Sequence, residues 1–420
     1  MSVYLERYAW PKSYIQQPPR PDTNIIVTIP CYNEQSLIPC FESLLLCELP
    51  AGSSVEVIAI VNESEDEAQS IVDTNKTCYK EACAWIKSNS SNDLRFFLLY
   101  EQLPKKHAGV GLARKIAMDE AVKRFEAIGK SDGVIVCYDV DCTCDPNYLK
   151  SIDQFFRDNS KCPGASIYFE HPTSGDAPDE NYKAIIDYEL FLRYYVNALR
   201  YAGHMHAYET IGSSMAVRAD AYQKQGGMNR RKAGEDFYFL QKIIPMGHFG
   251  EINNTRVIPS PRKSERVPFG TGRAVNQWIE QQALETYALQ GFDDLKDFLQ
   301  EVESFYQITE ARLNQLLSIL PPSISQFLTT VDFKSELQRI NKNANSLSVF
   351  YTQFYAWFDG FKALKYIHFA RDHFYPNQPV FEVARDLIEK IYSTIDDEIS
   401  PLQLLQIYRE LDREYSYFKQ

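Results

Sequence analysis

The sequence predicts an α/β protein: a mostly parallel, doubly wound sheet followed by an all-helical C-terminal domain. Short apolar runs alternate with longer stretches of helical period between residues 24 and 217. After residue 276 clear strand runs are missing, and long stretches such as 277–299 and 380–408 have helical character. We therefore expect an N-terminal extension at 1–23, an α/β domain at 24–275 and a helical domain at 276–420.

Five apolar runs are the candidate strands of the sheet: 25–29, 55–61, 94–99, 134–138 and 164–169. They are almost continuously apolar, as expected of strands that are covered by helices on both faces. The segments between them are long enough for crossover helices. Ligands of such sheets bind beyond the carboxyl ends of the strands, so the residues after each run are the candidates for binding and chemistry.

The composition is that of a globular protein, and it argues against several partners. Of 420 residues, 45% are apolar and 24% charged, which is enough for a substantial core. The formal charge of −12 provides no basic field for nucleic acid, so we expect no nucleic-acid partner. No apolar run has the length of a transmembrane segment and the N-terminus lacks a signal-peptide pattern, which predicts a cytoplasmic protein. Peripheral membrane association stays open.

The nine cysteines favour reduced, buried thiols, because their number is odd and several lie in apolar segments. Cys137, Cys142, Cys144 and Cys162 form an alternative zinc set. That alternative is weak, since no paired CxxC knuckles accompany them.

Asp139 and Asp141 follow the fourth run and are the strongest candidates for metal binding. On an extended strand residues i and i+2 point to the same face, so both carboxylates can converge on one divalent cation. Without a cation or a proton between them the two charges repel each other. The pattern predicts a site for a divalent metal ion.

Polar residues also follow the first three runs. Pro30 ends the pairing of the first strand, and residues 31–34 then present polar side chains and helix-start amides. Asn62 and Glu63 are placed to hydrogen-bond a base or a ribose. After the third run, Gly111 allows close approach of a ligand, and Lys106 and Arg114 supply cations for phosphate oxygens. A solvated cationic loop is the alternative.

Two later segments complete the candidate site. Asp236 lies at the start of a helix expected over 237–244, where it is either an N-cap or a carboxylate base. Residues 256–273 mix cations, prolines and glycines, which indicates a movable cationic loop that can close over a diphosphate. With the resemblance described below, Arg262, Lys263 and Arg266 are the proposed cations of this loop. A solvated loop without function fits the same composition.

The order of these motifs resembles that of the glycosyltransferases of family 2, which have the GT-A fold. The segments IIVTIPCYNE, IVNESEDEA, GVGLARKIAMDEAV, VIVCYDVD, GSSMAVRADAYQKQGGM and GEDFYFLQKI occur in the family's order. The resemblance covers roughly residues 24–275 and does not extend to the helical tail.

The resemblance implies a role for each matching residue. Asp139 and Asp141 would hold Mn²⁺ or Mg²⁺ on the donor diphosphate. Asp236 would be the base of an inverting transfer, and Glu235 would help to place the acceptor. The remaining donor-binding residues would be Pro30, Tyr32, Asn33, Glu34, Asn62, Glu63, Lys106, Gly111, Arg114, Arg262 and Arg266. The acceptor side would be Gly212, Ser213 and Ser214.

Three departures from the family pattern stand out. Lys115 replaces an Asn that many members have after the Arg, and Glu63 stands where Asp is common. Residues 257–260 offer no His as an additional metal contact after the last strand, so the third metal contact is open.

The sequence thus predicts a metal-dependent glycosyltransferase that moves a sugar from a UDP- or GDP-linked donor to an acceptor hydroxyl, with inversion. The helical domain would cover the acceptor site or mediate homo-oligomerisation. One rival is a haloacid-dehalogenase-type phosphatase, because 139–143 also fits its DxDxT pattern with Asp139 as nucleophile. The other is a non-catalytic nucleotide-binding scaffold.

Overall fold

The computed structural model describes residues 2–264, 270–392, 396 and 398–414. The chain forms two compact units that are interleaved in sequence. The first comprises Met1–Asp176, Thr210–Arg273 and Leu411–Gln420, and the second Ala177–Glu209 and Ala274–Glu410. The predicted boundaries divide the chain into consecutive segments, with an α/β domain at 24–275, and they stay a prediction. In the structure, residues 177–209 belong to the helical unit.

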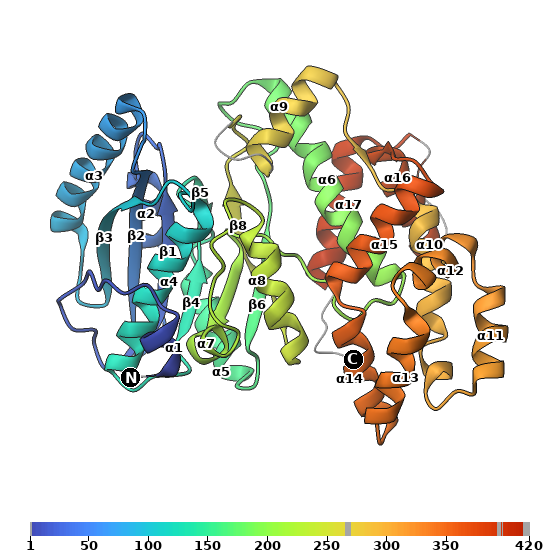
Figure 1. Ribbon diagram of the computed structural model, residues 1–420. Helices are drawn as coiled ribbons and strands as arrows, with labels where there is room; N and C mark the ends of the chain where they lie inside the picture. Colours follow the sequence, from blue (N-terminus) through green and yellow to red (C-terminus); the bar gives the residue numbers. More distant parts are fainter. Residues whose placement is uncertain (1, 265–269, 393–395, 397, 415–420) are drawn as a thin grey trace. The chain divides into compact units, whose positions relative to one another are not determined.

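The first unit contains an eight-stranded sheet with the order β3-β2-β1-β4-β7-β6-β8-β5 (Figure 1). Neighbours β1–β2, β2–β3, β1–β4 and β6–β8 are parallel, and β4–β7, β6–β7 and β5–β8 are antiparallel. This confirms the predicted mostly parallel α/β sheet. The strands are β1 (Thr23–Cys31), β2 (Ser54–Ser64), β3 (Leu94–Leu103), β4 (Val134–Cys137), β5 (Cys142–Cys144), β6 (Gly164–Phe169), β7 (Met215–Arg218) and β8 (Gly250–Pro259).

Helices cover this sheet because its central strands are apolar on both faces. The side chains of β2 are buried from Ser54 to Glu63, and α4 is buried on nearly all sides where it packs on β1 and β2. α3 packs on β2 and β3, and α5 on β8. The helices of this unit are α1 (Val3–Arg7), α2 (Ile38–Leu45), α3 (Gln69–Asn89), α4 (Val110–Ala127), α5 (Tyr148–Asp158), α7 (Ala219–Lys224) and α8 (Glu235–Ile243).

All five predicted strands are present, but two of their ends were placed wrongly. Pro30 lies within β1 and pairs in register with Ile60 instead of ending the strand. It is tolerated there because β4 pairs with β1 only as far as Thr28, so one side of β1 has already lost its neighbour. β2 continues through Asn62 and Glu63, which remain paired with β3.

The second unit is helical, and α6, drawn in green, packs against α16 and α10 (Figure 1). The predicted helix over 277–299 is two helices, since α9 ends at Gln281 and Gln282 adopts a positive φ of 55°. The predicted helix over 380–408 is likewise divided, into α16 and α17. The elements outside the first unit's core are α6 (Asp179–Tyr201), α9 (Thr271–Gln281), α10 (Leu289–Gln300), α11 (Glu310–Ile319), α12 (Pro322–Thr330), α13 (Phe333–Asn343), α14 (Leu347–Trp357), α15 (Gly360–His373), α16 (Val380–Tyr392) and α17 (Pro401–Glu414), with short strands β9 (Glu285–Thr286) and β10 (Gln378–Pro379).

The aromatic residues of α14 belong to the core of the helical unit. Phe350, Phe354 and Phe358 are fully buried, and the rings of Phe354 and Phe358 contact that of Phe298 in α10. The helical spacing of these aromatics therefore reflects packing.

The N-terminal segment is anchored to α4 by a buried hydrogen-bond network. The Tyr4 hydroxyl donates to Asp119 Oδ1 over 2.6 Å and accepts from Lys115 Nζ over 2.7 Å. Lys115 also forms an ion pair with Asp119 at 2.9 Å. Lys115, which departs from the family pattern, is thus a structural residue that fastens the N-terminal segment next to Arg114.

We expect Tyr4→Phe to lower the free energy of unfolding by about 1–3 kcal/mol, because it removes the shared partner of two buried charged groups. Tyr8→Phe is the matched control, since Tyr8 lies in the same segment and is 57% exposed. Urea unfolding curves of both variants test this. Equal stability of the two variants would contradict the assigned role of the hydroxyl.

A second buried cluster joins the sheet, α4 and the N-terminal segment. Glu56 on β2 is fully buried and forms ion pairs with Arg95 of β3 and Arg124 of α4. The two guanidinium groups also donate to the carbonyls of Pro18 and Gln17, at 3.1 and 2.9 Å. The carboxylate therefore holds three parts of the first unit together.

Candidate functional site

Arg114 is the centre of the first group of candidate residues. It is the fifth residue of α4, and its buried guanidinium donates to Asp139 Oδ1 at 3.0 Å, Glu235 Oε1 at 3.2 Å and the Gly212 carbonyl at 2.7 Å. Burial by itself lowers the pKa of Arg114, but the charges of Asp139 and Glu235 outweigh burial and raise it. One permanent cation thus connects Asp139, which follows β4, to Glu235 at the beginning of α8.

Asp236 lies next to this arginine at the start of α8. Both side chains lie against Gly212. A Cβ at this position would be only 2.8 Å from Arg114 Nη2 and 2.9 Å from Asp236 Oδ2. Asp236 Oδ1 also accepts from the Phe237 amide at 2.8 Å. The N-cap alternative does not describe Asp236, because the N-cap residue of α8 is Gly234.

Burial raises the pKa values of both carboxyl groups at the start of α8. The pKa of Glu235 rises to about 7, with the Arg114 charge opposing burial and the Asp236 charge adding to it. The pKa of Asp236 is also raised by burial, again against the opposing charge of Arg114. A carboxylate with a raised pKa is a stronger base, as proton abstraction from a hydroxyl requires.

Arg262 is the centre of a second group, just beyond β8. Its Nη1 donates to Glu34 Oε2 at 2.8 Å, and its Nε and Nη2 donate to Asp141 Oδ2 at 3.2 and 3.0 Å. Nη2 also contacts Glu34 Oε1. The side chain of Arg262 remains 39% exposed, in contrast to the 2% of Arg114.

Asp139 and Asp141 lie in a turn between β4 and β5, and not on an extended strand as the sequence suggested. The turn is closed by the amide of Cys142, which donates to the Asp139 carbonyl at 3.1 Å. Each carboxylate consequently contacts its own arginine, Asp139 with Arg114 and Asp141 with Arg262.

A third group lies at the ends of β1 and β2. Asn33, with a positive φ of 51°, donates its amide to Asn75 Oδ1 on α3. The Asn75 side chain in turn donates to the Asn62 carbonyl, and Glu63 Oε2 accepts from the Tyr100 hydroxyl at 2.6 Å. Within the described residues, the buried Asn62 Oδ1 has no hydrogen-bond partner. Such an oxygen is costly to bury and points to a missing donor.

Asn75 and Tyr100 were not among the predicted site residues. Asn75 is fully buried in α3, where a helix face toward the sheet is otherwise apolar, and a buried polar residue in that register is the signal that could have identified it.

The other predicted residues lie around these groups with different contacts. Gly111 permits a close approach, but to the Arg231 carbonyl, which a Cβ would meet at 2.2 Å. Ser213 and Ser214 are buried, and their hydroxyls lie 3.4 Å apart. Lys106 is exposed in the loop before α4, and Tyr32 is partly buried after β1. Arg266 lies outside the described residues.

The carboxylates fit a divalent metal that is shared with a ligand. The side chains of Asp139 and Asp141 are 35% and 30% exposed, and the guanidinium on Asp141 is already a cationic partner. Among the described residues, no three His, Cys, Asp or Glu side chains are grouped to bind a metal ion. Mg²⁺ commonly takes only one or two carboxylates and completes its shell with water and substrate phosphates, so two aspartates suffice.

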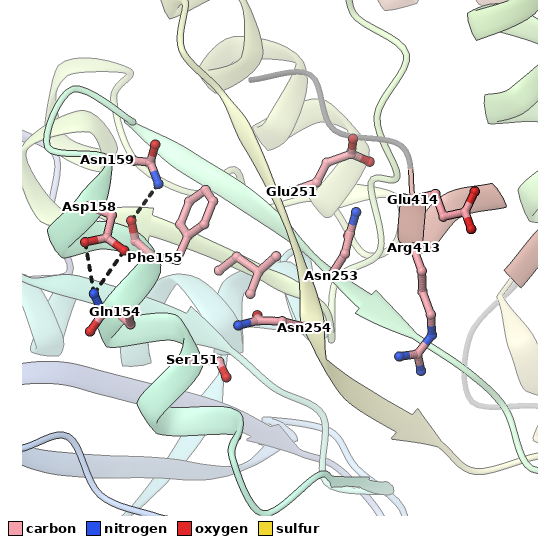
Figure 2. A pocket seen from close by; sticks show the side chains of 11 residues that line it. Ser151, Gln154, Phe155, Asp158, Asn159, Glu251, Asn253, Asn254, Arg413 and Glu414 are labelled. Carbon is pink, nitrogen blue, oxygen red and sulfur yellow. Dashed lines mark hydrogen bonds between the residues drawn. The ribbon is translucent and has the colours of Figure 1, made fainter. Parts of the chain in front are cut away.

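A pocket of about 440 Å³ lies elsewhere in this unit, between the end of α5 and the beginning of β8 (Figure 2). Gln154 and Asp158 of α5 hydrogen-bond to each other on one side, and Asn253 and Asn254 of β8 lie on another. It contains none of the predicted site residues. The candidate groups lie instead at the carboxyl ends of the strands, where ligands of such sheets bind.

We expect the rate at saturating substrate to rise with pH, with its midpoint near the value of about 7 to which burial raises the pKa of Glu235, and to level off at higher pH. The rate should rise with pH because a base at Asp236 must be deprotonated. At lower pH, Glu235 and Asp236 take up protons, and the deprotonated form of Asp236 is lost. Because removing one carboxylate relieves its neighbour, Glu235→Gln should move this rise to lower pH. A pH–rate profile at fixed Mn²⁺ tests both; a flat profile between pH 5.5 and 8 would contradict the assignment.

None of the described helices combines the length and apolar character that a membrane-spanning segment requires.

Comparison with known proteins finds a family match. Residues 26–224 match the model of glycosyl transferase family 2. No curated protein matches the chain. Among solved structures, TarS 1-349 of S. aureus in complex with UDP-GlcNAc is 14% identical, with 80% of this chain and 91% of that chain covered and a TM-score of 0.39. The mannosyltransferase PcManGT of Pyrobaculum calidifontis, in complex with GDP-Man and Mn²⁺, is 13% identical, with 96% and 89% covered and a TM-score of 0.34.

Proposed function

We propose, from the match of residues 26–224 to the model of glycosyl transferase family 2, that this chain transfers a sugar from a nucleotide-sugar donor to an acceptor hydroxyl. The observation that carries the proposal is the contact of one buried arginine, Arg114, with both Asp139 and Glu235, next to Asp236. This contact links a candidate metal-binding carboxylate to a candidate base through a fixed cation.

The nucleoside part of the donor would bind at the ends of β1 and β2. Support comes from the buried Asn62 Oδ1, which has no hydrogen-bond partner within the described residues and would accept an N–H or O–H from a base or ribose. Glu63 is held in place by Tyr100 and Asn75. An acceptor and a carboxylate together favour a base that donates hydrogen bonds, as uracil and guanine do.

The donor diphosphate would bind at Asp139 and Asp141 through Mn²⁺ or Mg²⁺. When bound, the metal would stabilise the negative charge that develops on the leaving diphosphate. Asp139 and Asp141 would hold it, and Arg114 would keep the Asp139 carboxylate in place through its 3.0 Å hydrogen bond. Leaving-group stabilisation by a cation removes the need for a protonated acid on that side.

Asp236 would take the proton of the acceptor hydroxyl as this oxygen attacks the anomeric carbon. The carbon–oxygen bond to the acceptor forms while the bond to the diphosphate breaks, so a single in-line displacement inverts the anomeric configuration. Burial, with a smaller contribution from the charge of Asp139, keeps the pKa of Asp236 above its ordinary value, which favours this proton transfer. Glu235 and the segment 212–214 would help to place the acceptor.

We expect Asp141→Asn to weaken the Mn²⁺-dependent binding of UDP or GDP by about 10- to 100-fold, because it removes one of two anionic metal ligands. Asp158→Asn on α5 is the matched control, since it removes an exposed carboxylate away from these groups. Isothermal titration calorimetry with and without Mn²⁺ measures both. Equal nucleotide affinity of the two variants would contradict the assignment of Asp141 as a metal ligand. Phosphate release from phosphomonoesters would instead favour the phosphatase.

A further inference from the structure

Among the described residues, Arg114 and Arg262 form ion pairs with carboxylates of the candidate site, and they differ in how firmly they are held. Arg114 is 2% exposed and has three acceptors on three separate segments. Arg262 is 39% exposed, and its described acceptors are two carboxylates only, Asp141 and Glu34. Arg114 is therefore a fixed counter-ion, whereas Arg262 is bound by contacts that another cation can replace.

The position of Arg262 matters because it contacts the proposed metal ligand itself. Its Nε and Nη2 both lie on Asp141 Oδ2, and the remaining edge of the guanidinium is turned to Glu34, which is buried to 5% exposure. A guanidinium on that oxygen and a metal ion on that oxygen compete for the same lone pairs. Without any cation, the nearby charges of Glu34 and Asp141 would repel each other.

We propose that Arg262 is the resting counter-ion of the metal site: it forms ion pairs with Asp141 and Glu34 while no donor is bound, and it competes with the divalent cation for Asp141. This inference rests on the proposed function. When a metal-bound nucleoside diphosphate binds, Asp141 exchanges the guanidinium for the metal, and Arg262 becomes available to the diphosphate oxygens. No covalent bond changes in this exchange.

The exchange has a consequence that a simple phosphate-binding arginine would not have. A residue that only binds phosphate leaves the affinity for the bare metal unchanged when it is removed. A competing counter-ion lowers the affinity for bare metal. Its removal therefore raises the affinity for bare metal and at the same time weakens the binding of nucleotide. The two measured affinities should thus change in opposite directions.

The test compares wild type with Arg262→Gln, Arg262→Lys and the control Lys224→Gln, which removes one charge from a lysine on α7 that is 63% exposed. Calorimetry or the electron paramagnetic resonance of free Mn²⁺ gives the affinity for Mn²⁺ alone, and a second titration gives that for UDP and GDP at saturating Mn²⁺. We expect Arg262→Gln to bind bare Mn²⁺ about tenfold more tightly than wild type and nucleotide more weakly. The affinities of Arg262→Lys should lie between those of Arg262→Gln and wild type, and those of Lys224→Gln should match wild type.

Unchanged or weaker binding of bare Mn²⁺ by Arg262→Gln would overturn the inference, and so would undetectable binding up to millimolar Mn²⁺. If wild type still binds UDP or GDP only with Mn²⁺ in that case, the proposed function stands and the counter-ion role alone fails. If wild type binds neither nucleotide, the proposed function fails as well. Thermal melts of all variants check that each is folded.

Discussion

Asp236→Asn is expected to lower the rate of sugar transfer by about 10²–10⁴-fold, the range that a positioned general base contributes. The substitution keeps the shape of the side chain and the oxygen that accepts from the Phe237 amide at 2.8 Å. It removes the negative charge and the lone pair that would take the proton of the acceptor. The affinity for the nucleotide should stay within about twofold of wild type, because the loss falls on the transition state.

Asp220→Asn is the matched control for this experiment. Asp220 also lies in the first turn of a helix, and its carboxylate accepts from the Ala221 amide at 2.7 Å, but it pairs with the exposed Lys224 on the surface. The release of UDP or GDP from the corresponding sugar nucleotide, with water or an added hydroxyl compound as acceptor, measures the rate. Full activity of Asp236→Asn would show that another group is the base.

Glu56→Gln is expected to lower the free energy of unfolding by about 3–5 kcal/mol, since it leaves two buried arginines without their anionic partner. The side chain of Glu56 is 0% exposed, and its carboxylate accepts a hydrogen bond from Arg124 Nη2 at 2.7 Å. Because Arg95 and Arg124 also bind the carbonyls of Pro18 and Gln17, the N-terminal segment should loosen with it.

The control for Glu56→Gln is Glu48→Gln, which breaks an ion pair with Lys150 whose two side chains are 54% and 61% exposed. An exposed pair of this kind contributes about 0–1 kcal/mol. Chemical unfolding followed by circular dichroism compares the two losses, and proteolysis within residues 1–23 reports on the N-terminal segment. A loss below about 1 kcal/mol for Glu56→Gln would contradict the central place of this carboxylate.

The sequence was sufficient to predict five of the eight strands of the sheet, because these five are largely buried runs of apolar residues, which hydropathy detects directly. β8 alternates between buried and partly exposed residues, and β5 has only three residues, so neither forms such a run. The ends of β1 and β2 were misplaced for the opposite reason. Pro30, Asn62 and Glu63 are residue types that usually end strands, yet they remain paired here with neighbouring strands. Pairing depends on where the neighbours end, which the residues of a single strand do not reveal.

The helical unit shows a similar limit. The stretch 277–299 contains no proline, and its only glycine lies inside α10, so nothing in the pattern marks the end of α9. That end is made by Gln282 in a left-handed conformation, and β9 then pairs with β10. Long-range pairing outweighs the local preference for a continuous helix.

The candidate residues came from motifs, but the motifs did not predict the partners of each side chain. Arg114 was expected to reach phosphate oxygens, whereas its buried guanidinium contacts Asp139 and Glu235. Arg262 was expected in a loop over the diphosphate, and it lies on Asp141 and Glu34. Side-chain direction arises from tertiary packing, so these ion pairs became visible only in the structure.

Saturation-transfer NMR of UDP- and GDP-sugars on the wild-type protein, with and without Mg²⁺, tests the central claim most directly. The account predicts saturable, Mg²⁺-dependent transfer to the base and ribose protons of one nucleotide series, and its loss in Asp141→Asn. Absence of saturable binding for every sugar nucleotide with Mg²⁺ present, by a wild-type protein that melts cooperatively, would contradict the assignment of a donor site.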